Sequence, residues 1–159
     1  MIVTRKQACE FITESLDNDI ELADEKLEAV ILAVNSDLQV RDWLMGLPKR
    51  WTLNEGIKLM QHLCVHAPAE DLVPFVTIQS LFYYEQGDQE KATMLLNYAL
   101  RLEGEYPLAQ LLRRVFLAGW PAESFQKMRE ELHSKVVESC YGEEGNTTIT
   151  ENGEVHVNV

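Results

Sequence analysis

The sequence has few cysteines and no long apolar run. Only three cysteines occur in 159 residues, Cys9, Cys64 and Cys140, and such an odd, widely spaced set is not the pattern of a disulfide-stapled secreted domain. No uninterrupted apolar stretch approaches the length of a membrane span, and residues 1–16 carry charges throughout, unlike a signal peptide. We therefore expect a soluble, cytoplasmic protein with reduced thiols.

Basic residues are also scarce. The chain has 14 Lys and Arg against 26 Asp and Glu, which gives a net charge of −12 at pH 7. This charge repels phosphate backbones, so we expect no direct nucleic-acid binding. The same charge favours a basic protein partner.

The motifs of common catalytic sites are missing. The eight glycines are scattered at predicted helix ends, and no Gly-x-Ser-x-Gly, Cys-x-x-Cys or His-Glu-x-x-His motif occurs. His62 and His66 are four apart, a spacing that can share a metal, but no further ligand stands at a suitable spacing. We predict no catalytic residues, no metal, no cofactor and no enzymatic activity.

Helical periodicity dominates up to about residue 140. Apolar residues recur three and four apart, and Thr4 and Thr52 stand where N-caps are expected, Thr52 with Glu55 as a capping box. Residues 47–51 have the composition of a connection. Residues 72–86 are apolar on nearly every side, which places their helix in the middle of a bundle. The sequence thus predicts an all-α bundle of about seven to eight helices, a single domain over 1–140.

One pair of predicted helices has a repeat-like spacing. Gly87 makes a turn, and the helix after it is expected to bury five apolar residues, Ala92, Leu95, Leu96, Ala99 and Leu102. The small residues at 92 and 99 and the large one at 96 resemble one tetratricopeptide repeat. Two interpretations stay open: a helical hairpin inside a globular bundle, and a curved array that forms a groove.

The stretch 67–125 also resembles a particular family. Its motifs are Ala67–Leu72, Gly87-Asp88, Tyr106–Ala109 and Ala118–Glu123, with Val40–Leu44 upstream. They are similar to the C-terminal helical part of an actinobacterial domain-of-unknown-function family, number 4192, over roughly residues 20–130. The resemblance implies a helical architecture and a bacterial or phage setting, and no mechanism.

The composition changes from residue 141 onward. The acidic segment 141–159 is rich in Gly, Asn and Glu, and is expected to be either disordered or a small β-hairpin. Asn152-Gly153 favours a two-residue turn, which would place Glu151 opposite Glu154. In that register Thr148, Thr150, Val155 and Val157 share one face of the hairpin.

The leading functional hypothesis is a non-enzymatic interaction or scaffold protein. On a tetratricopeptide-like hairpin, Thr77, Leu81, Tyr84 and Glu85 would face a partner segment, with Tyr84 giving apolar area and Glu85 selecting a basic residue. Burial in the bundle is the alternative for these four residues. Trp51 and Trp120 are secondary candidates for exposed anchors, or they close the core.

Two other functions remain open. The first is an acidic phage-type inhibitor or nucleic-acid mimic that occupies a basic groove through its charge, with strong salt dependence. The second is a structural subunit of a homo-oligomer.

Overall fold

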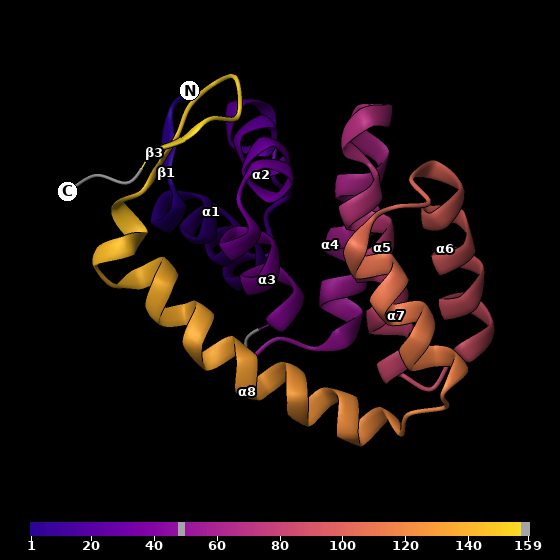
Figure 1. Cartoon of the computed structure of the whole chain (residues 1–159). Helices are drawn as coiled ribbons and strands as arrows, with labels where there is room; N and C mark the ends of the chain where they lie inside the picture. Colours follow the sequence, from indigo (N-terminus) through magenta and orange to yellow (C-terminus); the bar gives the residue numbers. More distant parts are fainter. Residues whose placement is uncertain (48–49, 157–159) are drawn as a thin grey trace. The chain divides into compact units, whose positions relative to one another are not determined.

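Helices make up most of the chain (Figure 1). The structure, a computed structural model, describes residues 1–47 and 50–156. Over these residues it contains eight α-helices, two short 3-10 helices and three two-residue strands. The prediction of an all-α bundle is therefore confirmed. Residues 48–49 of the expected connection, and Val157 of the expected hairpin face, lie outside the described residues.

The chain divides into two compact units. One, here called the terminal unit, combines Met1–Pro48 with Glu130–Val159, and the other, the central unit, is Lys49–Arg129. The single domain predicted over 1–140 stays a prediction, because two compact units can belong to one domain or to two.

The terminal unit begins with a capped helix. The Thr4 hydroxyl accepts the backbone N–H of Gln7 at 3.1 Å, and the Gln7 side chain accepts the N–H of Thr4 at 2.9 Å. This reciprocal pair confirms the predicted cap and satisfies two donors that a helix end leaves open. The unit's core contains Ile12, Val30 and Trp43, all fully or almost fully buried. Its elements are β1 (Val3–Thr4), α1 (Arg5–Asn18), α2 (Asp24–Ser36), α3 (Leu38–Gly46), the end of α8 (Ala122–Tyr141), η2 (Glu143–Asn146), β2 (Thr148–Ile149) and β3 (Val155–His156).

The residues after α8 form the predicted hairpin. Strand β2 pairs antiparallel with β3 and also with β1 at the other end of the chain, so three strands make one small sheet. The expected register is wrong by one residue, since Thr148 lies opposite His156. The turn contains three residues, 151–153, and ends at Gly153 with φ +82°. A three-residue loop that ends in a left-handed glycine is, after the two-residue turns, among the commonest hairpin connections.

The central unit is built around α5. Helix α5 (Val73–Glu85) packs against α4, α6 and α7, and every residue from 73 to 82 is buried. This confirms its predicted central position. The Ser80 hydroxyl donates to the carbonyl of Ala92 at 2.7 Å, so α5 and α6 form a closely packed hairpin. The predicted cap at Thr52 is also present. The other elements are α4 (Leu53–His66), η1 (Ala69–Asp71), α6 (Gln89–Leu102), α7 (Pro107–Leu117) and the start of α8.

Among residues 1–47 and 50–156, no helix combines the length and the apolar composition that crossing a bilayer requires.

Candidate functional site

The expected groove residues lie inside the central unit. Thr77 and Leu81 have no exposed surface, and Tyr84 is 4% exposed. Thr77 donates its hydroxyl to the carbonyl of Val73, one turn back in α5. Since a buried side chain is not available to a partner, these three residues fit the interpretation as bundle core rather than as an open groove.

Tyr84 is held by helix α7 and by the connection that follows it. Its ring stacks on Phe116 at 4.3 Å between centroids and meets the edge of Phe125 at 6.4 Å. Its hydroxyl donates to the carbonyl of Trp120. Burial raises the pKa of the Tyr84 phenol. The apolar area and the hydroxyl expected to serve a partner are thus both used inside the protein.

Glu85 pairs with an arginine from the start of α8. Arg129 donates from Nε and Nη2 to the two carboxylate oxygens of Glu85, each at 2.8 Å. The two side chains are only 1% and 6% exposed. This bidentate pair occupies the carboxylate that we expected to select a basic partner residue.

The two tryptophans lie in different surroundings. Trp51 is buried, with the Arg50 guanidinium 4.8 Å from its ring centroid. Trp120 is 41% exposed, between α7 and α8. Of the six predicted partner-binding residues, Trp120 alone presents a substantial part of its side chain at the surface.

A different apolar surface lies on α6. Met94, Tyr98 and Leu102 are 61%, 39% and 39% exposed, and their spacing of four residues places them along one face of the helix. We call these three residues the α6 stripe. The Arg101 guanidinium lies 5.9 Å from the centroid of the Tyr98 ring. The expectation that Leu102 is buried was wrong, because Ala92, Leu96 and Ala99 alone form the fully buried face of α6.

The α6 stripe was not predicted, although the sequence contains a signal for it. Apolar residues at 94, 98 and 102 repeat every four residues, beside a second apolar series at 92, 96 and 99. One helix cannot bury both series against the same neighbour. The small residues at 92 and 99 identify the series in close helix contact, which leaves the α6 stripe outside.

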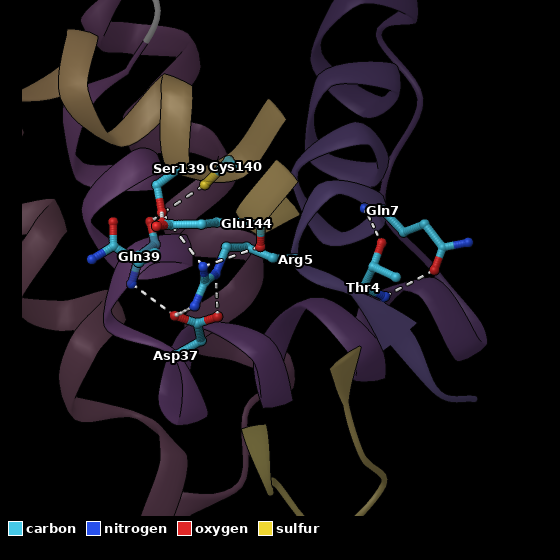
Figure 2. Close-up of polar contacts among 8 residues, drawn as sticks. All are labelled: Thr4, Arg5, Gln7, Asp37, Gln39, Ser139, Cys140 and Glu144. Carbon is cyan, nitrogen blue, oxygen red and sulfur yellow. Dashed lines mark hydrogen bonds and ion pairs between the residues drawn. The ribbon is translucent and has the colours of Figure 1, made fainter. Parts of the chain in front are cut away.

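The terminal unit contains a buried polar cluster around Arg5 (Figure 2). Arg5 Nε and Nη2 donate to the two carboxylate oxygens of Asp37 at 2.7 and 3.2 Å. Arg5 Nη1 donates to the carbonyl of Glu144 at 3.2 Å and to Ser139 Oγ at 3.4 Å. Asp37 also caps α3, since it accepts the N–H of Gln39 at 2.9 Å.

This cluster joins parts of the chain that are far apart in sequence. The start of α1, the start of α3, the end of α8 and η2 each contribute a group to it (Figure 2). The backbone N–H of Arg5 donates to the carbonyl of Thr147 at 2.8 Å, which adds the segment before β2. We refer to these contacts as the Arg5 clasp. These contacts hold the two ends of the chain together in the terminal unit.

A surface hollow adjoins the clasp. It has a volume of about 430 Å³ and an acidic lining with one lysine. Its lining residues are Lys135, Glu138, Ser139, Gly142, Glu143 and Glu144.

Metal-binding groups do not assemble in the described part of the chain. The rings of His62 and His66 lie 4.6 Å apart, edge to face. Over residues 1–47 and 50–156, no group of three His, Cys, Asp or Glu side chains is placed to hold a metal ion.

The thiol of Cys64 is expected to react slowly with alkylating reagents. Burial raises its pKa to about 12, so near pH 8 its thiolate fraction is roughly a thousandfold below that of an unfolded thiol. A more basic thiolate is more nucleophilic, which offsets part of this. We expect iodoacetamide to alkylate folded Cys64 about a hundredfold more slowly than the urea-unfolded chain.

Mass spectrometry over time measures this rate. Between about pH 8 and pH 9 the folded rate should rise about tenfold, because both values lie below the pKa, whereas the unfolded rate should rise only about threefold. Equal alkylation rates in the folded and unfolded chains would contradict the raised pKa of Cys64.

Over the described residues, the chain is an all-α protein with the apolar α6 stripe exposed at its surface. Its ion pairs Arg5–Asp37 and Arg129–Glu85 are buried, each within one unit. A family model described as Domain of unknown function (DUF4192) matches residues 4–123. The chain belongs to this family, which confirms the resemblance found in the sequence. No match to this chain was found among curated proteins or among solved structures.

Proposed function

We propose that this chain is a non-enzymatic protein-interaction module that binds a partner helix along the α6 stripe. The observation that carries the proposal is the exposure of Met94, Tyr98 and Leu102 on one helix face. Exposed apolar side chains at this spacing are what a partner helix covers when its own apolar residues pack at intervals of three and four.

The charges beside the stripe indicate the chemistry of the partner. Arg101 lies next to Tyr98, although the chain as a whole has a net charge of −12. A partner helix that places an acidic residue near Arg101 would gain a favourable ion pair and a defined register. We therefore propose an amphipathic partner helix with an apolar stripe and at least one acidic residue beside it.

The test places a photo-crosslinking amino acid at position 94 or 98 in the full chain, expressed in its own host. The control position is Val65 of α4, which is 78% exposed and lies in the same unit. We expect one crosslinked protein from positions 94 and 98 and none from 65. Peptide mapping should place the crosslink on a helical segment with an adjacent acidic residue.

Two charge reversals test the register of the complex. Arg101→Glu should weaken binding at least tenfold, because it brings like charges together. Arg113→Glu makes the same change of charge at an exposed residue of α7 and should leave binding within about twofold. Both substitutions should change the free energy of unfolding by less than about 0.5 kcal/mol. Equal effects of the two reversals would contradict the proposed surface.

The other two functions give different outcomes. If the crosslinked protein is a second copy of this chain, the stripe is an interface of a homo-oligomer, and sedimentation should show a dimer that Tyr98→Asp abolishes. If binding falls steeply with salt and is indifferent to substitutions in the α6 stripe, an acidic inhibitor or mimic replaces the proposal.

A further inference from the structure

Two of the three cysteines lie together in the terminal unit. The side chains of Cys9 in α1 and Cys140 in α8 have no exposed surface, and the Cys140 thiol lies close enough to Cys9 to help raise the pKa of the Cys9 thiol. Both are free thiols in this structure. This pairing could not be predicted from the sequence, because the two residues stand near opposite ends of the chain.

Neighbouring contacts hold the two cysteines in place. The Thr13 hydroxyl donates to the carbonyl of Cys9 at 2.9 Å and lies 3.5 Å from the Tyr141 hydroxyl. The Cys140 thiol is also 3.8 Å from the carbonyl of Gln39. Arg5 and Thr13 of α1, which lie on either side of Cys9 in the sequence, contact Ser139 and Tyr141 of α8, which lie on either side of Cys140. These contacts place the turn of α1 that contains Cys9 beside the last turn of α8.

We propose that Cys9 and Cys140 are a redox-sensitive pair that a peroxide oxidises to an intramolecular disulfide. One thiol, as its thiolate, attacks the peroxide oxygen and becomes a sulfenic acid with loss of water. The second thiol attacks that sulfur, the S–O bond breaks, and a second water leaves. In total two thiols and one hydrogen peroxide give one disulfide and two waters.

The surroundings make this oxidation slow in the closed protein. Burial raises the pKa of the Cys9 thiol and outweighs the opposing effect of Arg5. A peroxide also has no access to a sulfur without exposed surface. Oxidation therefore requires local opening of the terminal unit around the two cysteines. The disulfide then links α1 to the end of α8. The pair would respond to sustained oxidation and not to a brief pulse.

The test uses the full chain with Cys64→Ser, so that only the proposed pair remains. The protein is treated with hydrogen peroxide, quenched, denatured, alkylated and digested. We expect a crosslinked peptide that joins Cys9 to Cys140, two hydrogens lighter than the sum of its parts, and lost on reduction. We also expect the thermal midpoint to rise by roughly 5–10 °C, because the new bond closes a loop of most of the chain.

Cys9→Ser and Cys140→Ser in the same background are the matched controls and should show no oxidative rise in the midpoint. The peptide mapping does not depend on whether these controls fold. Alkylation of both cysteines after prolonged oxidation would overturn the proposal. So would sulfinic acid at either residue without a crosslink, or a disulfide found only between two chains.

Discussion

Replacing Arg5 with methionine should lower the free energy of unfolding by about 3–5 kcal/mol. The substitution keeps a long side chain but leaves the Asp37 carboxylate, which is 4% exposed, without its bidentate partner. It also removes the hydrogen bonds to Ser139 and to the carbonyl of Glu144. Urea unfolding followed by circular dichroism measures the change.

The loss of stability should be confined to the terminal unit, and it should depend on the burial of the Arg5–Asp37 pair. Hydrogen exchange should increase over residues 1–47 and 130–156 and much less over 50–129, because both partners of the clasp belong to the terminal unit. The exposed ion pair of Lys26 with Glu14 gives a control: Glu14→Gln should cost about 0–1 kcal/mol. A similar small cost for Arg5→Met would mean that the clasp contributes little to stability.

The second large effect should follow from Arg129→Met in the central unit. Here the Glu85 carboxylate is 1% exposed and receives two hydrogen bonds from Arg129. Removing the arginine should cost about 3–5 kcal/mol, because it breaks a buried charge pair from one side. Hydrogen exchange should now increase over residues 50–129.

A double variant separates the charge from the packing. Glu85→Leu with Arg129→Met removes both charges and should recover most of the lost stability, since apolar residues of similar volume often replace a buried ion pair at little cost. A double variant that is as unstable as Arg129→Met alone would show that packing around these side chains, and not their charge, is decisive.

Features set by neighbours in the sequence could be predicted. The caps at Thr4 and Thr52 depend on residues three positions further on, and both were found where expected. The central position of α5 followed from its uniform apolar composition, which any folded arrangement has to bury. The buried series at Ala92, Leu96 and Ala99 was predictable for the same local reason.

Features that depend on distant residues could not be predicted. Arg5 and Asp37 are 32 positions apart, and Glu85 and Arg129 are 44 apart. Each of these charged residues looks like an ordinary solvated position in the sequence, since no local pattern marks a pair that only the packed chain brings together. The same limit explains why groove and core both stayed open for Tyr84: the helix that stacks on its ring comes later in the chain.

The division of the terminal unit between both ends of the chain has a consequence during synthesis. The ribosome releases residues 1–47 before residues 130–156 exist, and at roughly 5–20 residues per second the wait is about 4–16 s. During this time the nascent chain has no β2 to pair with β1, and Asp37 and Arg5 have no Glu144 carbonyl beside them. The central unit is complete earlier, so it is expected to fold first. The unfinished N-terminal helices are then the segment that a chaperone would meet.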